Sequence, residues 1–215
     1  EANGTTPVSY LRVHYADNQA FKDALVDGFT METTFAVNGE RLPGDITPFR
    51  ATESGGFGFD IIPSGQVKFE VHTDIDGSKA YRYATTGAYV KTKTFYHFVG
   101  VYADGKVHCY INGINAATGD ATGEFNFPAV ESQWIGIGAD CGDTNGANFK
   151  IVNARLYNEP MTEAMVKALF NKQNGIDFNQ GDKQNNISYY NGSNFTELQN
   201  TVVGWGAPWT CDMQE

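Results

Sequence analysis

The feature that most constrains the fold of this chain is the alternation of apolar and polar residues with a period of two. Residues 67–75 show it most clearly, with large apolar residues at nearly every second position from Val67 to Ile75. Residues 29–37 alternate in a similar way. Successive side chains of a β-strand point to opposite faces, so we expect these segments to be half-buried strands.

Turn-forming residue pairs separate the alternating segments at short intervals. Pairs of this kind supply the positive φ values that tight hairpins need. Many short strands with frequent turns are typical of an all-β fold, and we predict a two-sheet antiparallel β-sandwich of the jelly-roll class. The pairs are Asn38-Gly39, Gly55-Gly56, Asp76-Gly77, Asp104-Gly105 and Asn112-Gly113.

Residues 95–111 predict a hairpin in detail. A two-residue turn at Asp104-Gly105 would place Gly100 opposite Cys109. Alternation then sorts the side chains of both strands onto two faces. We expect the buried face to carry Phe98, Tyr102, Val107, Cys109 and Ile111.

Helical periodicity is convincing in one segment, Met161 to Lys172, where apolar residues form a single stripe. A weaker helical turn is expected at 18–25. After Gly175 the composition shifts to Asn, Gln, Asp, Gly and Ser. We therefore predict a sandwich over residues 1–175 with one short C-terminal helix, and an irregular extension over 176–215 that packs on it.

The charge balance narrows the range of partners. The net charge of the 215 residues is −10, and such a surface repels phosphate backbones, so we expect no nucleic-acid partner. No apolar run approaches the roughly 20 residues of a membrane-spanning helix, so no transmembrane segment is expected. The chain has neither an initiator Met nor a signal peptide at its start, and we interpret it as a processed or truncated chain.

Four segments, taken in order, resemble laminin-G-like domains of the concanavalin A type. The meander at 93–113 resembles the Trp-His-His-Val…Tyr-Asp-Gly meander of that family. Ile135–Asp140 resembles its Ile-Gly-x-Asp strand. The residues 149–158, followed by 161–170, resemble its ending, Val-Arg-Ile-Tyr-Asn and a helix. The departures are Phe95 for the usual Trp, Lys150 for Gly and Asn153 for Asp.

The resemblance extends over residues 10–172 and implies a concanavalin A-like sandwich. Domains of this kind often recognise carbohydrates or proteins and often accompany secreted enzymes. We therefore expect a non-catalytic, lectin-like domain of an exported protein that binds a glycan or another surface ligand as a monomer. Its expected location is extracellular, periplasmic or at the cell surface. A structural spacer within a larger surface enzyme is an alternative.

A glycan hydrolase of the concanavalin A-like fold is the second alternative to a non-catalytic binding domain. Some enzymes of this fold hydrolyse glucans with two carboxylates on one strand, in a Glu-x-Asp-x-(x)-Glu pattern. The sequence lacks that pattern, and its nearest approach is Glu70 with Asp74. A hydrolase would need these two carboxylates to face one groove together.

The turn at Asp76-Gly77 leaves two registers open. A two-residue turn pairs His72 with Tyr81 and Glu70 with Tyr83, which places both rings beside the carboxylates on a polar face. A turn one residue longer pairs His72 with Arg82 and sends both tyrosines inward. Turn chemistry favours the first register, and core filling favours the second.

Sugars are held by aromatic rings that stack on them and by carboxylates that accept hydrogen bonds from their hydroxyls. An exposed Trp is a typical stacking platform, although packing is the favoured interpretation for Trp134, which opens a strand. The candidate carbohydrate-binding residues are Glu70, His72, Asp74, Tyr81, Tyr83 and Trp134.

Two further sites are expected in and near one Gly-rich loop. Asp140, Asp143 and Asn145 offer hard oxygen ligands for calcium, with local turn hydrogen bonds as the alternative. A disulfide between Cys141 and Cys211 would hold the extension to the sandwich, and laminin-G-like domains often have a disulfide near the C-terminus. The alternative is three free thiols.

Overall fold

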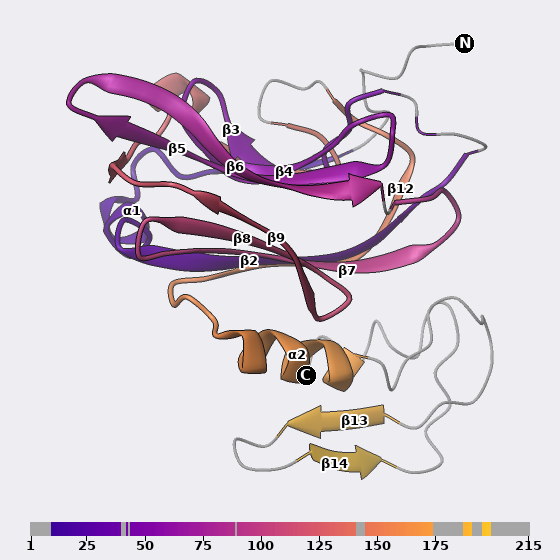
Figure 1. Ribbon diagram of the computed structural model, residues 1–215. Coiled ribbons are helices and arrows are strands. Elements are labelled where there is room, and N and C mark those ends of the chain that lie inside the picture. The colour runs from indigo at the N-terminus through magenta and orange to yellow at the C-terminus, as the bar shows by residue number, and fades with distance from the viewer. Residues whose placement is uncertain are drawn as a thin grey trace. The chain divides into compact units, whose positions relative to one another are not determined.

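The computed structural model describes residues 10–39, 42, 44–88, 90–140 and 145–173, and the backbone of the strands Ile187–Tyr190 and Phe195–Leu198. These residues form two compact units, with the boundary between Met161 and Thr162. The first unit contains two antiparallel sheets (Figure 1). The predicted fold class is therefore confirmed, including one short helix near the C-terminus.

The larger sheet of the first unit has seven strands. Its two longest strands, β5 and β6, form a hairpin. On the other side of β5 lie β4 and, further along the same strand, the short β10, and the sheet continues beyond β4 to β1. In spatial order the strands are β1 (Leu11–His14), β11 (Trp134–Ile137), β3 (Phe49–Thr52), β4 (Gly56–Ile61), β5 (Gln66–Ile75) and β10 (Glu124–Phe125), with β6 (Ser78–Ala88) also paired to β5.

The second sheet has five strands, and its central hairpin is the one expected from the sequence. Gly100 lies opposite Cys109, and Asp104 and Gly105 have φ values of 49° and 68°. Both values are positive, as a two-residue hairpin turn requires. The strands are, in order, β12 (Phe149–Tyr157), β2 (Gly28–Val37), β7 (Phe95–Ala103), β8 (Lys106–Ile111) and β9 (Ile114–Asp120).

The core lies between the two sheets and is dominated by aromatic rings. Phe29 of β2 packs against Phe57 of β4 with ring centroids 4.7 Å apart. Phe69 of β5 lies against β7 at Gly100, where an added Cβ atom would come within 2.2 Å of the ring. The predicted buried face of the β7–β8 hairpin is confirmed, because all of its members are buried: Phe98, Tyr102, Val107, Cys109 and Ile111.

The described residues also form short helices. In α1 (Gln19–Asp23) the side chain of Asn18 accepts a hydrogen bond from the backbone N–H of Phe21, which caps the helix where the sequence predicted its start. The C-terminal helix α2 (Glu163–Gln173) starts two residues later than expected, because Thr162 Oγ1 caps it by accepting from the N–H of Met165. A short 3₁₀ turn, η1 (Val130–Ser132), precedes β11.

The second unit contains α2 and a pair of antiparallel strands, β13 (Ile187–Tyr190) and β14 (Phe195–Leu198). Both strands lie within the extension expected after residue 175. The predicted boundary at that residue, and the packing of the extension on the sandwich, stay predictions. No helix in the described part of the chain is long and apolar enough to cross a membrane.

Candidate functional site

The turn between β5 and β6 decides between the two registers of that hairpin. Asp76 and Gly77 occupy it alone, with φ values of 52° and 84°. The register therefore pairs His72 with Tyr81, and Glu70 with Tyr83. Both tyrosines share the face of the sheet that carries Glu70 and His72, which is the arrangement that turn chemistry favoured.

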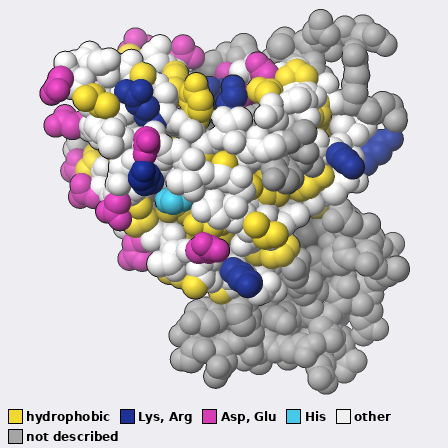
Figure 2. Space-filling model, viewed as in Figure 1, with side chains coloured by type: hydrophobic (Ala, Val, Ile, Leu, Met, Phe, Trp, Pro, Cys, Tyr) yellow, Lys and Arg dark blue, Asp and Glu magenta, His cyan; other side chains and the backbone are white. Residues whose placement is uncertain are grey.

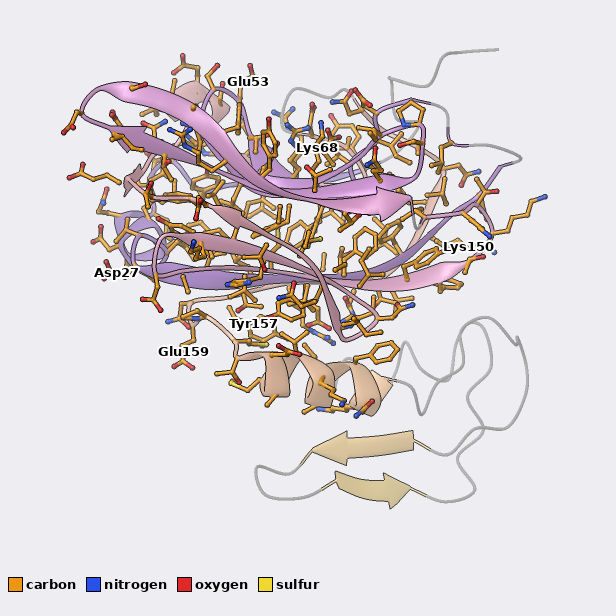
Figure 3. All side chains as sticks on the ribbon, viewed as in Figure 1. Asp27, Glu53, Lys68, Lys150, Tyr157 and Glu159 are labelled. Carbon is orange, nitrogen blue, oxygen red and sulfur yellow. The ribbon has the colours of Figure 1, made fainter. Side chains whose placement is uncertain are left out.

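This surface, the side of the seven-stranded sheet that points away from the five-stranded sheet, is called the outer face below. Alternation along each strand assigns its residues, because Phe57, Phe69, Val71 and Ile135 point into the core. In Figure 3, Lys68 of β5 marks the side of the outer face, and Tyr157 of β12 lies on the opposite side of the sandwich. All six predicted carbohydrate-binding residues lie on the outer face: Glu70, His72, Asp74, Tyr81, Tyr83 and Trp134.

An ionic cluster that was not predicted from the sequence occupies the centre of the outer face. The side chain of Arg50, from β3, passes over Gly58 of β4, where an added Cβ atom would lie 2.4 Å from Arg50 Cγ. Its Nη2 donates to Glu70 Oε1 at 2.5 Å, its Nη1 lies 3.7 Å from Asp60 Oδ1, and its Nε donates to Thr52 Oγ1. Glycine at position 58 is therefore what allows one guanidinium to link three strands.

Burial controls the electrostatics of this cluster. It raises the pKa of Glu70 and that of Asp60, and the positive charge of Arg50 opposes the shift in both. Burial alone would lower the pKa of Arg50, but the two carboxylates outweigh it and raise that pKa. Arg50, Asp60 and Glu70 thus shift one another's pKa values in a partly desolvated environment.

His72 and Tyr81 form the next row of the outer face, towards the β5–β6 turn. Their rings meet edge to face with centroids 4.6 Å apart. The hydroxyl of Tyr81 accepts from the backbone N–H of Gly55 at 3.3 Å, and Nδ1 of His72 lies 3.1 Å from Asn126 Nδ2. Burial, and then the charges of nearby basic side chains, lower the pKa of His72, so its neutral form is favoured.

The remaining predicted aromatic residues differ in how they are held. Tyr83 is 52% exposed, with Lys68 Nζ 5.9 Å from its ring centre. The ring of Trp134 is partly exposed and packs between neighbours, with the Arg12 guanidinium 4.3 Å and the His14 ring 4.4 Å from its centre. Tyr83 is therefore the more accessible stacking surface.

The side chain of Asp74 binds the backbone of its own turn. Its Oδ1 accepts from the backbone N–H of Gly77 at 2.7 Å, which caps the β5–β6 turn. Glu70 is only 6% exposed and is bound to Arg50. These two carboxylates therefore do not face one groove as the catalytic pair that a hydrolase would require.

Part of the predicted calcium loop is described. Asp140 is buried, and its Oδ2 accepts from Asn145 Nδ2 at 3.3 Å. Asp143 lies outside the described residues, as do both cysteines of the predicted disulfide, Cys141 and Cys211. Among the residues that the structure describes, no group of three or more His, Cys, Asp or Glu side chains is placed to hold a metal ion. Calcium binding and the disulfide stay predictions.

A second ionic cluster, also missed from the sequence, lies on the opposite surface, on the five-stranded sheet. Glu32 of β2 is fully buried and accepts from Tyr157 at 2.6 Å and from Arg155 Nη1 at 3.1 and 3.2 Å; His97 Nε2 lies 3.2 Å away. Burial would raise the pKa of Glu32. The hydrogen bonds and charges of these three partners outweigh burial and hold that pKa at about 2.

Solved structures with the same fold include several chains whose descriptions mention sugars. The binding domain of botulinum neurotoxin DC in complex with SialylT superposes with a TM-score of 0.58 at 16% identity, and the match covers 84% of this chain and 43% of that one. The CBM40 of a Ruminococcus gnavus IT-sialidase, bound to α2,3-sialyllactose, gives a TM-score of 0.56 at 14% identity, with 78% and 96% coverage.

Trypanosoma rangeli sialidase in complex with 2,3-difluoro-KDN gives a TM-score of 0.55 at 16% identity, covering 80% of this chain and 28% of that chain. The chain thus spans less than half of the sialidase, and half or less of the botulinum neurotoxin chains. At these identities the similarity concerns the fold.

No curated protein matches the sequence. A family model does match, over residues 14–167, and its description is the concanavalin A-like lectin/glucanases superfamily. That range is well over half of the chain and contains every described strand of both sheets except part of β1. The chain therefore belongs to the concanavalin A-like lectin/glucanase superfamily.

Proposed function

We propose that this chain is a non-catalytic, lectin-like domain that binds a glycan through the outer face of its seven-stranded sheet. The observation that carries the proposal is the hairpin register of β5 and β6. It places Tyr81 and Tyr83 beside Glu70 and His72, so that rings and hydrogen-bonding groups share one face. Sugars need this combination, because each sugar ring has apolar C–H groups and a rim of hydroxyls.

The roles of the residues follow from their exposure. Tyr83 offers its ring for stacking, since about half of it is accessible. Glu70 and His72 are each only 6% exposed, so we assign to each one polar atom, an acceptor on Glu70 and a donor on His72, and not the whole side chain. Trp134 is a second stacking surface at the far side of Arg50, on β11. Asp74 contributes by fixing the turn that sets the register.

The relatives give this proposal a context. Descriptions of two similar structures name sialylated ligands, and the family includes lectins. We infer the same general role here, in an exported or cell-surface protein. We also propose calcium as a structural ion for the loop of Asp140, Asp143 and Asn145, whose oxygens suit a hard cation.

The proposal is tested by exposing the labelled full chain to a glycan array and measuring each hit by calorimetry. Tyr83→Ala should weaken binding about tenfold, because the stacking surface is lost. Ile114→Ala is the control, since Ile114 is 70% exposed on β9 of the other sheet and its loss should leave affinity unchanged. A chain that binds no glycan, or a Tyr83→Ala variant that binds as well as the parent, would refute the proposal.

A further inference from the structure

Two of the three guanidinium nitrogens of Arg50 donate hydrogen bonds to the protein itself. Its guanidinium contacts Glu70 at 2.5 Å, Asp60 at 3.7 Å and Thr52. An acidic sugar would require a basic side chain whose donors point outward, because a carboxylate binds a guanidinium through paired N–H groups. In the arginine at the centre of the outer face, Nη2 donates to Glu70 and Nε to Thr52, and Nη1 faces Asp60 at 3.7 Å, so the guanidinium faces two carboxylates of the protein itself.

The charged side chains around Arg50 also disfavour an acidic ligand. Asp140 acts electrostatically on Arg50 and on Asp60, and Asp45 acts on Asp60. Of the basic side chains, Lys68 joins Arg50 in acting on Glu70 and Asp60. Four carboxylates and two cations therefore act on the centre of this face, whereas Lys79 and Arg82 act on the adjacent His72. A further carboxylate brought in by a ligand would be repelled and would raise the pKa values of its neighbours.

The end of the sandwich at which the β5–β6 turn lies is also acidic. Figure 2 shows Asp and Glu side chains along the left edge of the visible surface, the side on which the β5–β6 turn lies in Figure 1. The whole chain has a net charge of −10. Long-range electrostatics thus disfavour the approach of an anionic glycan.

The hydrogen-bonding role of His72 can be assigned from its neighbours. Asn126 Nδ2 lies 3.1 Å from His72 Nδ1 and 3.4 Å from the backbone carbonyl of Ser54. A carbonyl oxygen only accepts hydrogen bonds, so the nitrogen of the amide, and not its oxygen, must face Ser54. That nitrogen therefore donates to Nδ1 as well. A neutral imidazole that accepts at Nδ1 carries its proton on Nε2.

Nε2 of His72 is thus a hydrogen-bond donor, and no described residue accepts from it. Glu70 lies two residues before His72 on β5. Its Oε1 accepts from Arg50, and no described residue donates to its Oε2. A donor and an acceptor consequently lie side by side on one strand, next to the exposed ring of Tyr83. A sugar hydroxyl can both donate and accept, so uncharged hydroxyls satisfy both groups.

We infer that the ligand of the outer face is an uncharged saccharide, whose hydroxyls accept from His72 Nε2–H and donate to Glu70, and that acidic glycans are excluded. This inference rests on the proposed function and specifies its ligand class. It separates this chain from the similar structures whose descriptions name sialylated ligands.

The first test measures the tautomer of His72 in the free full chain, by ¹⁵N NMR of the imidazole nitrogens at pH 7. The expected spectrum is that of a neutral ring protonated at Nε2. A ring protonated at Nδ1, or a charged ring, would overturn the assignment of His72 as a neutral donor. This readout needs no ligand and no variant.

The second test compares binding of the full chain to lactose and to α2,3-sialyllactose, and to an array of uncharged glycans with their sialylated or uronic-acid counterparts. Uncharged members should bind at least tenfold more tightly. A preference for the acidic members would overturn this inference and leave the proposed glycan-binding function intact. Absence of binding to every glycan would refute the proposed function and the inference together.

A variant pair connects the two tests. His72→Phe keeps a ring and removes the donor, and it should lower affinity for the best uncharged glycan about tenfold, the effect of one hydrogen bond. The control is His108→Phe, on β8 of the other sheet, which should bind as the parent does. Thermal melts of both variants establish that they are folded. Unchanged binding by a folded His72→Phe would overturn the role of His72.

Discussion

Glu32 offers a quantitative test of how this sandwich is stabilised. The carboxylate is fully buried, and its partners hold its pKa at about 2, against a usual value of 4.5. At about 1.4 kcal/mol for each pH unit, the difference corresponds to about 3 kcal/mol in favour of the folded state. Because the folded pKa is the lower one, this stabilisation is complete above pH 4.5 and is lost as the pH falls towards 2.

The substitution Glu32→Gln keeps the shape and removes the charge. At pH 7 it should lower the free energy of unfolding by about 3 kcal/mol, because Arg155 and His97 lose the anion that they face. The side chain of Arg155 is 42% exposed, so water can partly replace the lost partner, which keeps the cost at the lower end for a broken buried pair. At pH 2 the parent carboxyl is neutral in the unfolded chain and about half protonated in the folded one, so most of the stabilisation from its charge has been lost. The difference between the two proteins should then approach zero.

The assay is urea unfolding of both proteins at several pH values between 7 and 2, followed by circular dichroism. The control is Glu159→Gln, which removes an exposed carboxylate near the end of β12 (Figure 3) and should give a curve parallel to that of the parent. A difference between Glu32→Gln and the parent that stays constant from pH 7 to pH 2 would refute the reasoning. It would mean that packing, and not ionisation, accounts for the effect of the residue.

Three other measurements follow from the structure. Gly100→Ala should destabilise the fold by about 1–3 kcal/mol in a thermal or urea melt, because the new Cβ atom would meet the Phe69 ring; an unchanged melt would contradict this packing. Burial raises the pKa of Cys109 to about 12, so its thiol should react with a thiol reagent at neutral pH only after unfolding, and rapid labelling of the native protein would be contrary to expectation. If the loop of Asp140 and Asn145 binds calcium, excess chelator should lower the melting temperature, whereas an unaltered temperature would argue against the ion.

The sequence predicts the hairpins of this fold well because their determinants are local. Asp104 and Gly105 fix the register of β7 and β8, and alternation then assigns the buried face. The β5–β6 hairpin was ambiguous, since core filling suggested that its tyrosines point inward. The turn chemistry prevailed because the core opposite Phe69 needs only a small residue, Ala84, when rings from other strands fill the space.

The two ionic clusters could not be predicted in the same way, because they depend on which strands become neighbours. Arg50 reaches Glu70 only because β3, β4 and β5 are adjacent and position 58 is glycine. Glu32 and Arg155 are 123 residues apart in sequence and meet through the pairing of β2 with β12. No local pattern in the sequence indicates that Arg50 and Asp60 meet.

The two ionic clusters contain the same residue types, yet the pKa of the carboxylate is lowered in one and raised in the other. The hydrogen bonds to the carboxylates explain this difference in pKa. Glu32 accepts from Arg155 and Tyr157 and faces His97, and its lowered pKa is that of a carboxylate satisfied by the protein. In the outer-face cluster the pKa values are raised, and Asp60 Oδ1 has no hydrogen-bond partner among the described residues. A buried polar group left without a partner is costly to a fold, and groups with shifted pKa values cluster at functional sites. No described residue donates to Glu70 Oε2 or accepts from His72 Nε2, so a ligand of the seven-stranded sheet has hydrogen bonds to gain from these two atoms.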